Sequence, residues 1–147
     1  MKDFIKITNA YLANIGVFYI KLHNLHWNVI GPQFKTVHEY LESIYEFIAG
    51  VLDEVAEYIK MENEYPLASL KDYLETADMV ELKSNDYSIN EALKIVLEDV
   101  TLLKNQALQL RVFADKIDKY ALANMLEEHI KQYDKTIWFI NSMLKVD

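Results

Sequence analysis

Apolar residues recur along two N-terminal stretches at alternating spacings of four and three, the period of a helix with one buried face. The pair Gly31-Pro32 separates the stretches, because proline disfavours helical geometry in the residue before it and fits the first turn of a following helix. We therefore expect two long helices in a tight hairpin, the second opening with a capping box at Thr36 and Glu39. The rows are Phe4, Tyr11, Ile15, Phe18, Leu22, Leu25 and Val29, interrupted by Thr8, and Val37, Leu41, Ile44, Ile48, Val51, Val55 and Ile59.

Two further helical rows occupy the C-terminal part of the chain. Ser88 and Glu91 have the spacing of a capping box at the start of the first row, and a break near residues 115–120 precedes the second. Residues 61–87 lose the periodicity, and within them only residues 69–77 favour a short helix. The rows are Leu93, Val96, Val100, Leu103, Ala107, Leu110, Ala114 and Ile117, then Leu122, Leu126, Ile130, Tyr133, Ile137, Ile140 and Leu144.

Two helical hairpins joined by one long connection are typical of the ferritin-like variant of the four-helix bundle. Short loops throughout would instead favour simple up-down topology. We predict an all-α fold, a ferritin-like four-helix bundle with a short extra helix in the long crossover between the second and third helices. At 147 residues, of which 52% are hydrophobic, the chain suits one domain, 1–147, with a single core.

The absence of cysteine excludes disulfide scaffolds, thiol catalysis, iron-sulfur clusters and thiolate zinc sites. Any metal site must use His, Asp or Glu. The uncharged stretch Ile7 to Ile20 is too short and too polar to span a bilayer, and the N-terminus lacks the pattern of a signal peptide. We therefore expect a cytoplasmic protein that does not interact with membranes.

The formal charge of −8 disfavours binding to nucleic acid, because an acidic surface repels phosphates unless a basic patch is set apart for them. The densest basic stretch, residues 116–119, alternates with Asp115 and Asp118. We therefore expect no binding to DNA.

Candidate metal ligands occur in pairs that share a helix face. The Glu-x-x-His motif of ordinary di-iron bundles is missing, because none of the four histidines has a glutamate three positions before it. A lone histidine is usually a hydrogen-bonded or surface residue and acidic pairs are usually solvated, so each pair taken singly is a weak signal. The candidate pairs are His23 with His26, His38 with Glu42, and Asp53 with Glu57.

His38 and Asp53 are too far apart on one helix to bind the same ion. Fifteen positions separate them, which at about 1.5 Å per residue is roughly 22 Å along the axis. Two antiparallel copies of that helix, related by a two-fold axis near Tyr45 and Glu46, would set His38 of one subunit opposite Asp53 of the other. Such a pair would contain two equivalent intersubunit sites.

At these positions the sequence resembles the Dps family of mini-ferritins in order and spacing. The resemblance covers essentially the whole chain, and its first block is the most specific. The blocks are residues 21–29 (KLHNLHWNV), 31–34 (GPQF), 37–39 (VHE), 53–57 (DEVAE), 66–74 (PLASLKDYL) and 134–138 (DKTIW).

The resemblance implies a hollow homododecamer with ferroxidase centres at its two-fold interfaces. These centres oxidise Fe(II), preferably with hydrogen peroxide, and the shell stores Fe(III) as a mineral, which protects against oxidative damage. The ligands it implies are His26 and His38 of one subunit with Asp53 and Glu57 of the other, Glu42 as a candidate outer ligand, Trp27 beside the centre and His23 in the surrounding shell or interface.

This sequence departs from the family pattern at the acidic residues that line the iron-entry pores in many members. Only Asp115 matches them, and Tyr120 and Asn124 occupy the other two positions. Asp118, Glu127 and Glu128 are candidate replacements. Two alternative functions stay open at this point: a DNA-compacting nucleoid protein, and a surface or immune-stimulating shell without significant catalysis.

Overall fold

The computed structural model describes residues 2–145, which form five helices and one two-stranded parallel pairing. The prediction of an all-α fold is confirmed in its main elements, including the short helix in the crossover. The elements are α1 (Lys2–Asn28), β1 (Val29–Ile30), α2 (Phe34–Met61), α3 (Leu70–Thr76), β2 (Tyr87–Ser88), α4 (Ile89–Lys116) and α5 (Tyr120–Leu144).

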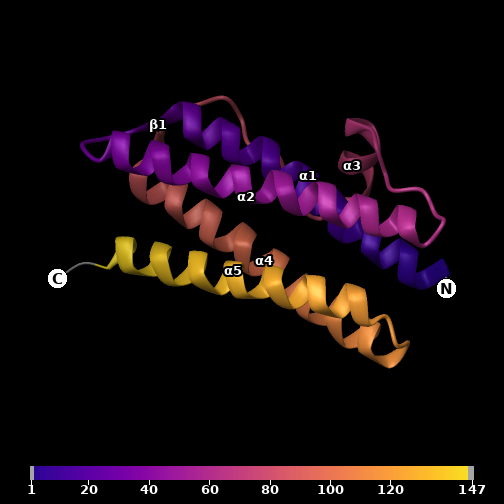
Figure 1. Cartoon of the computed structure of the whole chain (residues 1–147). Helices are drawn as coiled ribbons and strands as arrows, with labels where there is room; N and C mark the ends of the chain where they lie inside the picture. Colours follow the sequence, from indigo (N-terminus) through magenta and orange to yellow (C-terminus); the bar gives the residue numbers. More distant parts are fainter. Residues whose placement is uncertain (1, 146–147) are drawn as a thin grey trace.

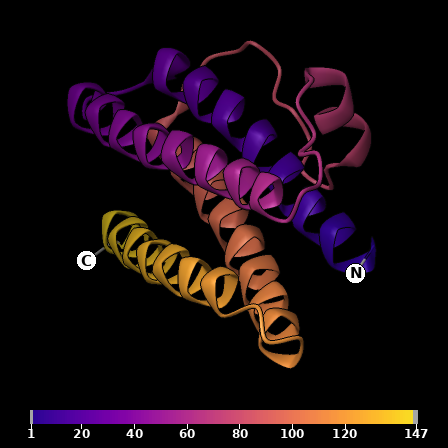
Figure 2. The same cartoon turned by 45° about the vertical axis from the view of Figure 1, so that its right-hand side comes forward.

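The four long helices form two antiparallel hairpins, α1 with α2 and α4 with α5 (Figure 1). The hairpins pack on each other mainly through α1 and α4. The crossover carries the chain from the end of α2 back along the molecule, so that α4 starts beside the end of α1. The rotated view shows α3 on the outer side of α1, away from α5 (Figure 2).

The predicted apolar rows form the core, except for Ile117, which follows the last residue of α4 and is exposed. Phe4, Tyr11, Phe18, Leu41 and Leu126 are all fully buried, as expected for one face of each long helix. Thr8, which interrupts the first row, is fully buried as well. Its hydroxyl donates to the Phe4 carbonyl at 2.8 Å. Its polar group is thus satisfied within the helix, and the row continues through it.

The capping box at the start of α4 is confirmed, whereas the one at the start of α2 is wrong. The Ser88 hydroxyl accepts from the Glu91 amide at 3.2 Å, and the Glu91 carboxylate accepts from the Ser88 amide at 2.9 Å. Helix α2 begins earlier, at Phe34, with Gln33 as its N-cap and no side-chain cap. Thr36 therefore lies inside the first turn of α2.

The turn between α4 and α5 forms without Gly or Pro because Asp118 adopts a φ of 58°, a left-handed conformation that Asp tolerates. The Lys119 amide then donates to the Ala114 carbonyl at 2.8 Å and closes the end of α4.

Side chains of α1 fix the path of the crossover. The Asn14 carbonyl oxygen accepts from the amides of Asp78 and Met79, at 2.9 and 3.0 Å. The Asn9 carbonyl oxygen accepts from the Leu67 amide at 2.9 Å. At the far end, β1 pairs with β2 in parallel, Val29 opposite Tyr87, which ties the end of α1 to the start of α4.

Within residues 2–145 no helix combines the length and apolar character that a membrane span requires.

Candidate metal centre

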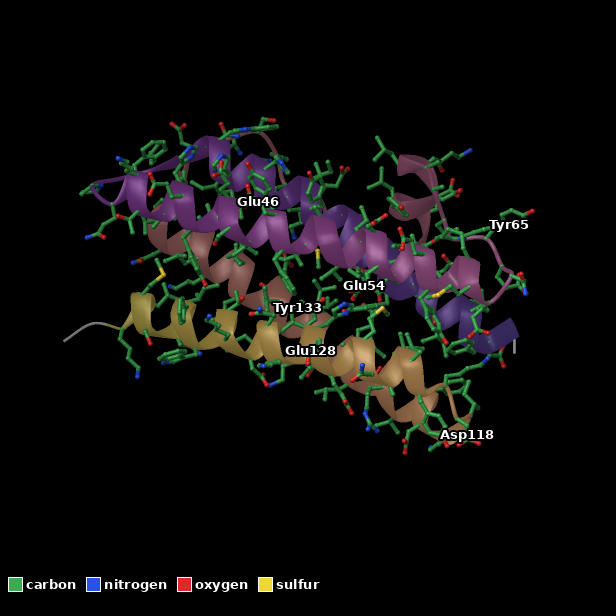
Figure 3. All side chains as sticks on the ribbon, in the orientation of Figure 1. Glu46, Glu54, Tyr65, Asp118, Glu128 and Tyr133 are labelled. Carbon is green, nitrogen blue, oxygen red and sulfur yellow. The ribbon has the colours of Figure 1, made fainter. Side chains whose placement is uncertain are left out.

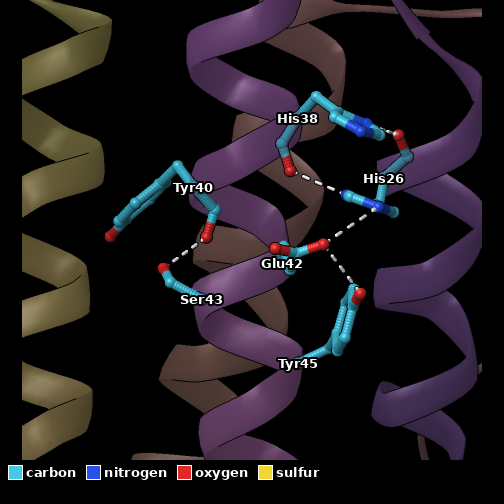
Figure 4. A network of polar contacts seen from close by, with 6 residues as sticks. All are labelled: His26, His38, Tyr40, Glu42, Ser43 and Tyr45. Atoms are coloured by element: carbon cyan, nitrogen blue, oxygen red, sulfur yellow. Dashed lines mark hydrogen bonds and ion pairs between the residues drawn. The ribbon is translucent and has the colours of Figure 1, made fainter.

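His26 near the end of α1 and His38 in the first turns of α2 lie face to face. Their ring centroids are 3.7 Å apart and the ring planes differ by 11°. Nδ1 of His26 donates to the His38 carbonyl at 2.7 Å, and Nδ1 of His38 donates to the His26 carbonyl at 2.6 Å (Figure 4). Because a carbonyl oxygen only accepts, each Nδ1 carries the proton in these bonds. In the neutral form of each ring, Nε2 is then the nitrogen that carries the lone pair with which an imidazole binds a metal.

Glu42 brings a carboxylate to the same place, one turn after His38. Its Oε1 lies 3.9 Å from Nε2 of His26 and accepts a hydrogen bond of 3.2 Å from the Tyr45 hydroxyl. The Tyr45 ring also stands edge-on to the His26 ring, with centroids 5.2 Å apart. Tyr45 therefore orients both the carboxylate and the imidazole, a role that the sequence did not suggest.

His23 and Trp27 extend this aromatic cluster along α1. Nδ1 of His23 donates to the Tyr19 carbonyl at 2.8 Å, and its ring stacks on Tyr45 with centroids 4.0 Å apart. The Trp27 ring centroid is 5.5 Å from that of His23. Trp27 is 67% exposed, so a large apolar surface lies open on this face of the subunit.

Asp53 and Glu57 lie four residues apart on an exposed face of α2. Helix α2 is continuous from His38 to Asp53, so the axial separation of roughly 22 Å holds in the structure. One subunit does not bring these carboxylates to the histidine pair. Within residues 2–145 no three His, Asp or Glu side chains converge closely enough to hold an ion together.

The candidate pore residues lie near the turn between α4 and α5, and two of them share one arginine. Arg111 lies 3.6 Å from Asp115 and 2.8 Å from Glu127, so its charge offsets part of theirs. Asp118 accepts from the Tyr120 hydroxyl at 3.0 Å, and Glu128 is exposed on α5. These bonds reduce the negative charge available for attracting cations at Asp115 and Glu127.

His129, the fourth histidine, lies on α5 and belongs to none of the candidate ligand pairs. It is only 3% exposed, and it contacts Glu54 of α2 and Tyr11 of α1. Its place in the apolar spacing between Leu126 and Tyr133 is a signal that could have placed it inside the bundle.

Comparison with known proteins identifies the family. Residues 5–147 match the ferritin-like domain family. The DNA protection during starvation protein of Brevibacillus brevis is 34% identical over 139 residues, which cover 95% of this chain and 93% of that protein. This chain belongs to the Dps family of ferritin-like proteins.

Solved structures superpose closely on the fold. Antigen TpF1 of Treponema pallidum matches with a TM-score of 0.96 at 29% identity, covering 99% of this chain and 93% of that one. The Dps protein of Vibrio cholerae O1, described as a member of a broad superfamily of ferritin-like diiron-carboxylate proteins, matches with a TM-score of 0.94 at 25% identity, covering 98% and 90%. The ferritin-like fold predicted for the chain is therefore confirmed.

Proposed function

We propose that this Dps-family chain oxidises Fe(II), preferably with hydrogen peroxide, at centres completed between two subunits of a hollow dodecamer that stores the ferric product. The observation that carries the proposal is the pair His26 and His38, whose Nδ1 atoms are both engaged and whose Nε2 atoms are both available. Two imidazoles with carboxylates form a mixed nitrogen and oxygen donor set that suits iron without thiolate.

The remaining ligands would come from a second subunit. Asp53 and Glu57 are exposed on α2, so an antiparallel copy of α2 can present them to the histidines. Glu42 would act from the histidine side, held by Tyr45. The description of the Vibrio cholerae Dps protein as a diiron-carboxylate protein supports this choice of ligands.

The chemistry follows from pairing two one-electron donors with one two-electron oxidant. Two Fe(II) ions, one hydrogen peroxide and two protons give two Fe(III) ions and two water molecules. Because both electrons are supplied together, no hydroxyl radical is released. The activity would thus protect the cell, its DNA included, by removing the reactants of radical formation without any contact with DNA.

The test is stopped-flow oxidation of Fe(II) by purified protein, with hydrogen peroxide and with oxygen as alternative oxidants. We expect consumption of two Fe(II) per peroxide and a faster reaction with peroxide. His38→Ala should lower the rate at least tenfold, because loss of groups that hold a metal costs this much or more. Glu39→Ala, the exposed neighbour on the same helix, should leave the rate unchanged. Wild-type protein that oxidises Fe(II) no faster than buffer would overturn the proposal.

A further inference from the structure

A chain of hydrogen bonds runs from the core to the surface through side chains of α5, α1 and α2. The hydroxyls of Tyr133 and Tyr11 are 2.6 Å apart, and the Tyr11 hydroxyl is 3.1 Å from Nδ1 of His129. Nε2 of His129 is 2.6 Å from Oε1 of Glu54. Figure 3 labels its two ends, Tyr133 on α5 and Glu54 on α2, on facing helices.

The bonds of this chain share one direction when the neutral imidazole of His129 donates from Nε2 to the Glu54 carboxylate. Nδ1 is then left as an acceptor. Tyr11 then donates its phenolic proton to Nδ1, and its oxygen accepts from the Tyr133 hydroxyl. Each phenol therefore points its proton toward the histidine.

Burial isolates the inner part of the chain from water. Tyr11 is 0% exposed, Tyr133 is 1% exposed and His129 is 3% exposed, whereas the Glu54 side chain is 56% exposed. Burial raises the pKa of both phenols. Burial also lowers the pKa of His129, although its hydrogen bond to Glu54 opposes this. A neutral phenol thus faces a neutral base, and simple ionisation of the tyrosine is disfavoured.

A phenol in this setting loses an electron most readily when its proton leaves at the same time, because neither a buried phenolate nor a protonated phenoxyl cation then forms. His129 supplies the acceptor for that proton at hydrogen-bond distance. The outer end of the chain is Glu54, the residue that follows the candidate ligand Asp53 on α2.

We propose that Tyr11 donates one electron to the reaction of Fe(II) with peroxide, and that His129 accepts its proton. Tyr133 is a second residue on which the resulting tyrosyl radical can reside. The inference rests on the proposed function for its oxidant. It applies when peroxide meets a centre that holds a single Fe(II), so that one of the two electrons is missing.

This reaction needs no reductant besides Fe(II) and the Tyr11 phenol. Fe(II), hydrogen peroxide and the Tyr11 phenol give Fe(III), hydroxide, water and a neutral tyrosyl radical. The phenolic proton passes to Nδ1 of His129, and the water takes an equivalent proton from solvent. Transfer of a hydrogen atom from Tyr133 to Tyr11 then moves the radical to Tyr133. The hydroxyl-radical equivalent is consumed inside the protein.

The test loads intact protein with one Fe(II) per centre, adds hydrogen peroxide, and records the radical by freeze-quench electron paramagnetic resonance. We expect a tyrosyl signal that is strongest at one Fe(II) per centre and declines at two. Tyr11→Phe and His129→Gln should each lower its yield several-fold. Tyr58→Phe is the matched control, because Tyr58 is buried and donates to Glu62 at 2.7 Å but contacts no histidine, so the yield should be unchanged.

A second readout locates the radical even if a variant folds poorly. Replacing Tyr11 or Tyr133 by 3-fluorotyrosine adds a fluorine splitting to the signal if the radical resides there, and we expect it at one position or both. Normal Fe(II) oxidation with no tyrosyl signal, or a signal that neither fluorinated residue alters, would overturn this inference alone, leaving the chain a structural feature. Absence of Fe(II) oxidation would instead refute the proposed function.

Discussion

The short crossover helix α3 packs against α1 through one contact that leaves no space for a side chain. A Cβ atom at Gly16 would lie 2.6 Å from Cδ2 and 2.9 Å from Cε2 of Tyr73. Tyr73 is the half-buried ring that anchors α3, and the backbone on both sides of the contact is helical. Gly16→Ala therefore forces the ring and α3 outward.

Two terms of opposite sign determine the effect of Gly16→Ala on stability. Replacing a mid-helix glycine by alanine stabilises by about 0.5–1 kcal/mol, whereas overpacking a tight contact costs about 1–3 kcal/mol. Gly50 on α2 supplies the reference, because a Cβ there meets nothing of its own subunit within 4 Å. We expect Gly50→Ala to gain the first term alone and Gly16→Ala to be less stable than it by about 1–3 kcal/mol.

Thermal unfolding of both variants at equal protein concentration measures this difference. For a chain of this size each kcal/mol shifts Tm by roughly 2–4 °C. Hydrogen exchange of residues 70–76 should also accelerate in Gly16→Ala, because the anchoring ring is displaced. Equal Tm values for the two variants, with unchanged exchange in α3, would refute the reasoning.

Two further predictions concern pH and DNA. Burial lowers the pKa of His129 in the folded chain, so as the pH falls below about 6.5 the unfolded state gains the proton first and stability is lost. Wild type should therefore lose more Tm than His129→Gln between pH 7.5 and 5.5, and equal losses would contradict this. A dodecamer of chains at −8 would carry roughly −96 formal charges, so we expect no shift of duplex DNA in gels at physiological salt without divalent metal. A salt-sensitive shift would contradict it.

The sequence predicted the helices because their apolar periodicity reports a buried face directly. The start of α2 was misplaced because Thr36 and Glu39 have capping-box spacing inside a helix that Gln33 begins without a side-chain cap. The pairing of β1 with β2 escaped prediction because two residues carry no periodicity of their own, and their contact depends on where the crossover ends.

The sequence named candidate ligands for the centre, and it did not predict the contacts that hold them in place. The family resemblance joined His26 with His38, but their reciprocal bonds to each other's carbonyls exist only once α1 and α2 pack. The sequence placed Tyr45 near the proposed two-fold axis, and it gave no sign of the hydrogen bond from Tyr45 to Glu42. His129 joins three helices, and local spacing cannot specify a contact of that kind.

The central claim is that one subunit supplies the histidines and its partner supplies Asp53 and Glu57. We expect His38→Ala and Asp53→Ala each to lower Fe(II) oxidation at least tenfold while the shell stays assembled, because these changes remove proposed ligands and little buried apolar area. In a mixed pair, one centre lacks both ligands and the other is intact.

The decisive measurement is Fe(II) oxidation by the two inactive variants after they are refolded together. Random pairing makes about half of all pairs mixed, so about one quarter of wild-type activity should return. His26→Ala refolded with His38→Ala is the control, and it should stay inactive because every centre then lacks a histidine. Mixtures of His38→Ala and Asp53→Ala that mass spectrometry shows to share dimers, yet stay as inactive as their parents, would contradict the intersubunit centre.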